Sequence, residues 1–189
     1  MMVSKIEKLL LSNQTVFSTQ DLSVFWGMNN DESLYSLIKY YVKIGKLQRE
    51  YKGIYSVGKF TSFELGQKLL VPSYISFYSA LATHGLIYQY YDEFHLIALK
   101  SKKIQVNERI FSYHQVKEEI FYNQLGIIDY KTYQLASAER AICDSLYLTP
   151  NLAFDSLAGV NFDKLLDIAQ IYKNKRLLRE IEELISSNG

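Results

Sequence analysis

The chain has 189 residues, of which 48% are hydrophobic and 22% charged, a composition that excludes a disordered protein and suits one large domain or two small ones. The single cysteine, Cys143, excludes an intramolecular disulfide and a cysteine-based zinc site. No run of about 18 apolar residues occurs, and the amphipathic first residues lack the apolar core of a signal peptide, so we expect a cytoplasmic protein without a membrane partner.

Charge is unevenly distributed along the chain, although the net charge is only +1. Residues 1–70 contain nine Lys and Arg against six Asp and Glu, whereas residues 71–189 contain twelve against fourteen. This mild asymmetry favours an anionic partner for the first part of the chain.

The first 60 residues predict three short helices followed by a hairpin. Helical spacing and capping serines indicate helices at residues 4–12 and 18–27, with a turn at 13–17 between them. A third helix is predicted over residues 31–44, and a tight turn indicates a β-hairpin over residues 46–58. This order predicts a winged helix-turn-helix domain over residues 1–60, with the third helix in the DNA major groove.

The predicted third helix and the hairpin carry side chains that suit contacts to duplex DNA. Asn can pair bidentately with adenine, and Lys and Arg bind phosphate. The candidate DNA-binding residues are Asn29, Asn30, Ser33, Ser36, Lys39, Tyr40, Lys43, Lys46, Arg49 and Lys52. Because winged helices also dock proteins, an interaction adaptor that binds no DNA is an alternative.

Residues 61–72 predict a joint with a short helix, and residues 73–189 predict an α+β domain. Residues 74–86 have helical spacing, with Ser73 or Ser76 as the cap and Gly85 after the last turn. The rest of this domain is expected to form a mostly antiparallel sheet followed by C-terminal helices, with strand-like runs at 93–100, 102–116 and 126–137. A turn at Asn107 and Glu108 is expected to divide the second run. One helix, capped by Ser137, is predicted at 136–148, and two helices are predicted within residues 161–187.

Three blocks of sequence resemble the antitoxin and transcriptional regulator of the abortive-infection E (AbiE) type IV toxin–antitoxin systems. The blocks are "GIYSVGKF" at the end of the predicted winged helix, "PSYISFYSALATHGL" at residues 72–86, and "YQLASAERAICDSLYL" at residues 133–148. They match the family in order and spacing and extend over about residues 1–150.

The resemblance implies an autorepressor that binds inverted repeats in its own promoter through the winged helix. It implies that the second part is an antitoxin that opposes a nucleotidyltransferase-like toxin encoded nearby. Members of this broad family also occur as solitary regulators. Inverted repeats favour two protomers on the DNA, so a dimer is expected there.

Catalytic and metal-binding patterns are weak, so we expect no enzyme, no catalytic residue, no cofactor and no metal ion. His84, His95 and His114 lack the short spacing of a metal site, and Cys143 is expected to be a small buried side chain. Glu139, Arg140 and Asp144 are expected to form a salt-bridge set on a helix surface.

One alternative is a metal-dependent nuclease. The triplet Asp129-x-Lys131 on a strand-like run is similar to the acidic-x-Lys element of restriction-type nucleases, in which acidic groups hold a divalent metal. Such a site needs a second acid, for which Asp92, Glu93 and Glu108 are the candidates.

Overall fold

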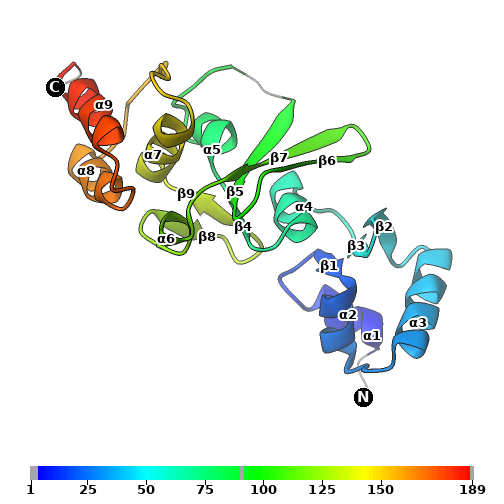
Figure 1. The fold of residues 1–189 in the computed structure, drawn as a ribbon. Coiled ribbons are helices and arrows are strands. Elements are labelled where there is room, and N and C mark those ends of the chain that lie inside the picture. Colours follow the sequence, from blue (N-terminus) through cyan, green and yellow to red (C-terminus); the bar gives the residue numbers. More distant parts are fainter. Residues whose placement is uncertain (1–3, 90–91, 188–189) are drawn as a thin grey trace. The chain divides into compact units, whose positions relative to one another are not determined.

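The computed structural model describes residues 4–89 and 92–187, so the outermost ends of the expected domains, residues 1–3 and 188–189, lie outside the described residues. The chain divides into two compact units, residues 1–71 and 72–189. Both helices and strands occur in each unit, which confirms the α+β class (Figure 1).

The first unit combines helices with a small antiparallel sheet of order β1-β3-β2. Residues 13–17 were expected to form only a turn, but Val16 and Phe17 belong to a strand that pairs with β3. This strand is three residues long, too short for an alternating pattern to identify it. The elements are α1 (Lys5–Leu10), β1 (Val16–Ser18), α2 (Thr19–Trp26), α3 (Asp31–Lys43), β2 (Gln48–Tyr51), β3 (Ile54–Ser56) and α4 (Ser62–Leu69).

Local capping signals explain where the first three helices begin. Ser4 and Ser18 each form a capping box with the acidic residue three positions later, and Asn30 caps α3 by accepting a hydrogen bond from the Ser33 amide. Gly27 ends α2 in the left-handed conformation, with φ of 61°. These boundaries confirm the expected helix starts, because caps depend on neighbouring residues alone.

Helix α4 packs within the first unit, whereas residues 61–72 were expected to form a joint between domains. The Glu64 side chain of α4 is 2% exposed and accepts hydrogen bonds from the Thr15 and Val16 amides at 2.7 and 2.9 Å. It also accepts a bond from the Thr15 hydroxyl. This carboxylate therefore ties α4 to the start of β1.

Replacing Glu64 by Ala is expected to lower the free energy of unfolding of the first unit by about 2–3 kcal/mol, because buried amides lose a charged acceptor. Trp26 is the only tryptophan of the chain and is buried in the first unit, so its fluorescence during urea unfolding measures this effect. The exposed Gln20→Ala is the control, and equal stability of the two variants would contradict the role of Glu64.

The second unit contains a mixed sheet of order β6-β7-β5-β4-β9-β8, in which β4–β9 and β5–β7 are parallel and the other three pairings are antiparallel. The sheet is thus mostly antiparallel, as expected. The elements are β4 (Ser73–Ile75), α5 (Phe77–Thr83), β5 (Glu93–Ala98), β6 (Lys102–Val106), β7 (Arg109–Gln115), α6 (Glu118–Phe121), β8 (Ile127–Asp129), β9 (Gln134–Ala136), α7 (Ala138–Leu148), α8 (Phe162–Gln170) and α9 (Lys175–Ser186).

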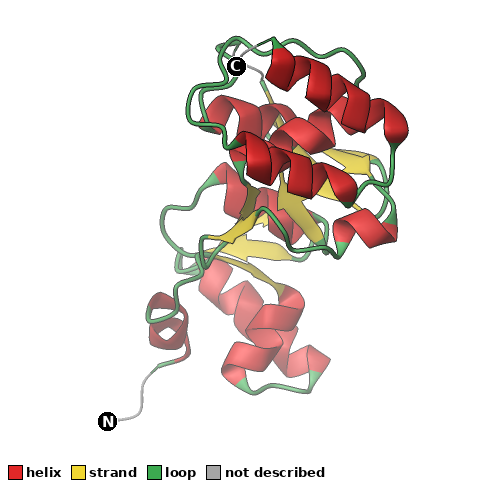
Figure 2. Cartoon of the chain, turned by 90° about the vertical axis from the view of Figure 1, so that its left-hand side faces the viewer, coloured by secondary structure: helices red, strands yellow, loops and turns green. Residues whose placement is uncertain are grey.

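Helices of the second unit lie over its sheet (Figure 2). Helix α5 contacts β5 and α7, while α8 and α9 pack against α7. Residues 74–86 were expected to be one helix, but Ser73–Ile75, which include the first two of these residues, form β4 between β5 and β9. All three residues are buried, and a short strand buried on both faces has no alternation that distinguishes it from a helix.

Candidate nucleic-acid interface

Helix α3 is held against the core of the first unit by one face. Leu34 and Ile38 are each 2% exposed, and Tyr41 packs against Trp26 with ring centroids 5.6 Å apart. The Trp26 indole in turn donates a hydrogen bond to the Lys5 carbonyl at 2.9 Å. Since the buried residues recur at helical spacing, the opposite face of α3 is left to solvent.

The turn between α2 and α3 fixes the start of α3. The Met28 amide donates to the Ser23 carbonyl at 3.0 Å, and the Ser23 hydroxyl donates to the Met28 carbonyl at 2.6 Å. Met28 also packs against the hydrophobic core of the unit. A short turn closed at both ends in this way sets the direction in which α3 leaves α2.

An outer stripe, defined as Glu32, Ser36, Lys39 and Lys43, extends along the solvent side of α3. Its members are exposed and follow the spacing i, i+4, i+7 and i+11, which places them on one side of a helix. Tyr35 and Tyr40 flank the stripe and are 48% and 55% exposed. The stripe carries hydroxyl and acidic groups toward its start and amines toward its end.

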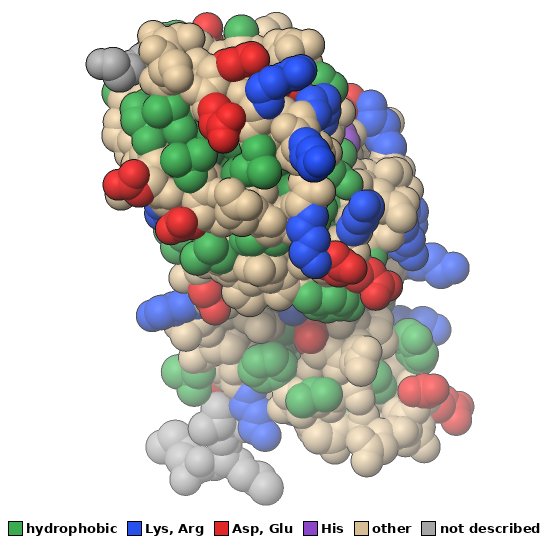
Figure 3. Space-filling model, turned by 60° about the vertical axis from the view of Figure 1, so that its left-hand side comes forward, with side chains coloured by type: hydrophobic (Ala, Val, Ile, Leu, Met, Phe, Trp, Pro, Cys, Tyr) green, Lys and Arg blue, Asp and Glu red, His purple; other side chains and the backbone are tan. Residues whose placement is uncertain are grey.

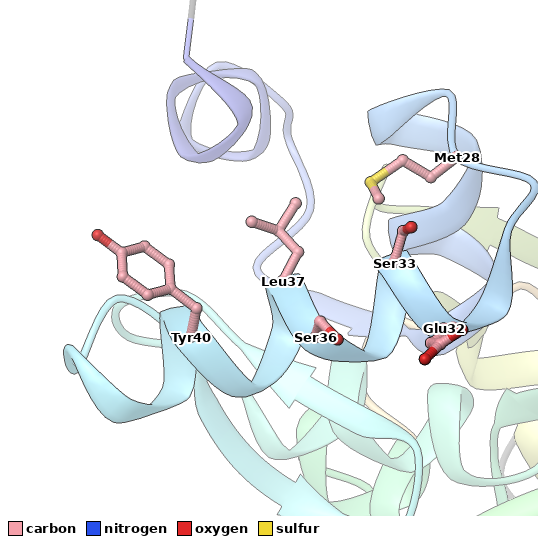
Figure 4. Close-up of a pocket in the computed structure, with 6 residues that line it drawn as sticks. All are labelled: Met28, Glu32, Ser33, Ser36, Leu37 and Tyr40. Carbon is pink, nitrogen blue, oxygen red and sulfur yellow. The ribbon is translucent and has the colours of Figure 1, made fainter.

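A surface groove of about 580 Å³ lies beside this stripe (Figure 4). Figure 4 shows Ser33 and Leu37 pointing to the side of α3 on which Met28 lies, while Glu32 and Ser36 occupy successive turns. The residues that line it are Met28, Glu32, Ser33, Ser36, Leu37 and Tyr40.

The β2–β3 hairpin is attached to the start of α2 through its tip. The Thr19 amide donates to the Gly53 carbonyl at 2.9 Å, and Gly53 has φ of 73°, a conformation that favours glycine. The buried Glu50 carboxylate accepts a hydrogen bond from the Ser56 hydroxyl at 2.6 Å. Arg49 and Lys52 are exposed on this anchored hairpin.

All ten candidate residues are exposed in the first unit, and most lie on α3, the turn after it, or the hairpin. Asn30 is also the N-cap of α3, because its side-chain oxygen accepts a hydrogen bond from the Ser33 amide at 3.0 Å. Asn29 is exposed in the preceding turn. Glu32 was missed, although its spacing to Ser36 could have identified it.

A buried polar network connects α7 to the rest of the second unit. Arg140 and Asp144 are 0% exposed, and Glu139 is 5% exposed, so the expected salt-bridge set on a helix surface is wrong. The Arg140 guanidinium donates to the Ile120, Asn123 and Leu125 carbonyls at 2.7, 3.0 and 3.1 Å. Sequence spacing cannot show that α6 and the following loop cover this side of α7.

The Asp144 carboxylate accepts hydrogen bonds from three hydroxyl groups on two other segments, residues 74–76 and Tyr172. Tyr172 and Ser76 donate at 2.5 and 2.7 Å, and Tyr74 donates at 3.1 Å. Burial raises the pKa of the Tyr74 and Tyr172 hydroxyls, so they remain protonated donors. With its guanidinium partner and these donors, the network is saturated with hydrogen bonds and acts as a structural clamp.

Cys143 is also fully buried, as expected. Burial raises the pKa of its thiol well above the ordinary value, which keeps the sulfur protonated and poorly nucleophilic.

His84 lies at the C-terminal end of α5 and anchors that end to β9. Its ring nitrogen Nε2 donates to the Ala136 carbonyl at 2.8 Å. Gly85 follows with φ of 70°, the left-handed conformation expected after a last helical turn.

His95 and His114 meet across the parallel strands β5 and β7, although 19 residues separate them in the sequence. His95 Nδ1 and His114 Nε2 are 2.9 Å apart, and the two rings are nearly parallel, at 15°. Phe77 lies against both rings. Burial lowers the pKa of His95 to about 4 and also lowers that of His114.

The second unit is expected to lose stability as the pH falls from about 6.5 to about 4. Both histidines have a lower pKa in the folded protein than in the unfolded chain, so the unfolded chain binds more protons in this pH range. The free energy of unfolding therefore reaches its full value only above the pKa of the unfolded chain. For His95 the shift corresponds to about 3 kcal/mol. Hydrogen exchange of β5 and β7 amides at several pH values measures this loss.

His95→Gln is the test variant for this pH dependence, since its pH profile should be flatter than that of the wild type. The first unit is an internal control, because all three histidines of the chain lie in the second unit. Parallel pH profiles for the variant and the wild type would contradict the role of the pair.

Asp129 and Lys131 form a local turn at the end of the edge strand β8. The Lys131 amide donates to the Asp129 carboxylate at 2.6 Å, and Lys131 has φ of 70°. Glu93 lies on β5, three strands away in the sheet, or about 14 Å at ordinary strand spacing. Among residues 4–89 and 92–187, no group of three or more His, Cys, Asp or Glu is arranged to hold a metal ion.

The face of the second unit in Figure 3 carries both acidic and basic side chains, so it is not a uniformly basic surface. Within the described part of the chain, no helix has the length and apolar character needed to cross a membrane. No protein-family model matches the chain, and no curated protein matches it.

Proposed function

We propose that the chain is a DNA-binding transcriptional regulator whose first unit is a winged helix-turn-helix. In this proposal α3 enters the major groove, and the β2–β3 hairpin is the wing that contacts the phosphate backbone. The observation that supports it best is the exposure of Lys39, Lys43, Arg49 and Lys52 on α3 and the hairpin of the first unit. Such cations contribute the electrostatic part of DNA affinity.

The proposed biological role follows the resemblance to AbiE-type antitoxins. We propose a cytoplasmic autorepressor that binds inverted repeats in its own promoter, as a dimer on the DNA. The second unit would oppose a nucleotidyltransferase-like toxin, which requires no catalysis by this chain. The charged groups of the buried hydrogen-bond network of α7 are directed inward, where they make the second unit rigid. A rigid unit suits the proposed role as a scaffold for protein contacts.

Fluorescence anisotropy with a labelled duplex from the region upstream of the gene tests DNA binding. The wild type should bind this duplex more tightly than a scrambled one at moderate salt, and Lys39→Ala or Arg49→Ala should each weaken binding about fivefold. Lys117→Ala, which removes an exposed lysine of the second unit, is the control. Equal binding to both duplexes would contradict a specific repressor.

A second experiment addresses the proposed toxin partner. The tagged chain is co-expressed with any nucleotidyltransferase-like reading frame adjacent to its gene, and toxicity and co-purification are measured. Rescue of growth supports the antitoxin role. Rescue together with no binding to any duplex would instead support an interaction adaptor.

A further inference from the structure

The two halves of α3 present different chemistry on the outer stripe. Lys39 and Lys43 lie on the second half, while residues 27–38 contain neither Lys nor Arg but include Asp31 and Glu32. A carboxylate is repelled by phosphate, so Asp31 and Glu32 gain nothing from the DNA backbone. If α3 enters the major groove, a favourable DNA contact of Glu32 must come from base edges.

Glu32 is the acidic group that lies on the outer stripe itself. It is exposed, lines the groove of Figure 4 together with Ser33 and Ser36, and has no ion-pair partner among the described residues. Asp31 carries the same charge at the same end of the helix but is rotated from Glu32 by about 100°. Favourable interaction with the helix dipole therefore applies to both residues, whereas only Glu32 belongs to the outer stripe and lies at the edge of the surface groove.

We infer that Glu32 reads a cytosine in the major groove, with the Ser33 and Ser36 hydroxyls beside it as further contacts to base edges. A carboxylate can only accept hydrogen bonds, and the major groove offers donors only at the amino groups of cytosine and adenine. At guanine O6 or thymine O4 the carboxylate would face an acceptor and be repelled. At adenine the N7 acceptor lies beside the amino group, so cytosine is the favoured base. This inference rests on the proposed function and adds to it a preferred base.

Selection of duplexes from a random library, followed by sequencing, tests the assignment. The wild type should enrich a motif with cytosine at one position, preferred about tenfold over guanine or thymine. Glu32→Ala should lose the preference at that position and keep the rest of the motif. Glu32→Gln should shift the preference toward adenine, because an amide pairs bidentately with adenine N6 and N7.

Asp31→Ala is the matched control, since it removes the same charge from the same helical turn and should leave the motif unchanged. Fluorescence of Trp26 checks that each variant remains folded. A motif that is identical in the wild type, Glu32→Ala and Glu32→Gln overturns the assignment and leaves the proposed function standing. If the wild type enriches no sequence at all, the proposed function itself fails, and this inference fails with it.

Discussion

Replacing Arg140 by Met is expected to lower the free energy of unfolding of the second unit by about 3–5 kcal/mol, because the partner of a buried charge is removed. The Asp144 carboxylate, which is 0% exposed in the wild type, then has lost its partner cation, the Arg140 guanidinium. It also leaves three backbone carbonyls around α6 without the guanidinium that donates to them. Few single substitutions in this chain should cost as much.

Arg140→Lys should recover only part of this loss. A lysine ammonium is a compact point charge and cannot reach the carbonyls of Ile120 and Asn123 in the forked geometry of a guanidinium. Hydrogen exchange of α6 and α7 amides measures the change in the second unit. Arg179→Ala, at a side chain that is 72% exposed, is the control and should change stability by less than about 0.5 kcal/mol. Comparable protection in Arg140→Met and Arg179→Ala would contradict the clamp.

Removing four cations together, in Lys39/Lys43/Arg49/Lys52→Ala, is expected to reduce DNA affinity by about two to three orders of magnitude at 0.15 M salt. Each phosphate contact contributes about 0.9 to the slope of log affinity against log salt, so the slope should become shallower by about three to four. Anisotropy titrations over a range of salt concentrations measure both quantities.

The control for this variant replaces four exposed lysines of the second unit by Ala. These are Lys100, Lys102, Lys117 and Lys175. It removes the same charge, so the net charge of the chain is matched. An equal change of slope in both variants would mean that general charge, rather than α3 and the hairpin, determines binding.

Local sequence signals predicted much of the fold. Capping residues such as Ser18 and Ser137 identified helix starts, and the turn at Asn107 separated β6 from β7 as expected. The short strands β1 and β4 escaped prediction, because pairing with distant strands defines them and three residues show no period. Helix α6 was also missed, because its four residues are too few to show a helical period.

Contacts between distant segments explain what the sequence could not show at the candidate sites. His95 and His114 become neighbours only through the parallel register of β5 and β7. The i, i+4 spacing of Arg140 and Asp144 indicated an ion pair but not its burial. On α3, by contrast, the amphipathic period alone identified Lys39 and Lys43 as exposed, since one face of a helix follows from spacing.

The central claim is that α3 and the β2–β3 hairpin form a DNA-binding surface. Backbone amide NMR of the full chain, with and without a duplex from its own upstream region, tests binding and location together. The account predicts salt-sensitive shift changes concentrated at residues 29–52, with the second unit largely unchanged. Unchanged spectra, or changes confined to residues 72–189, would contradict it.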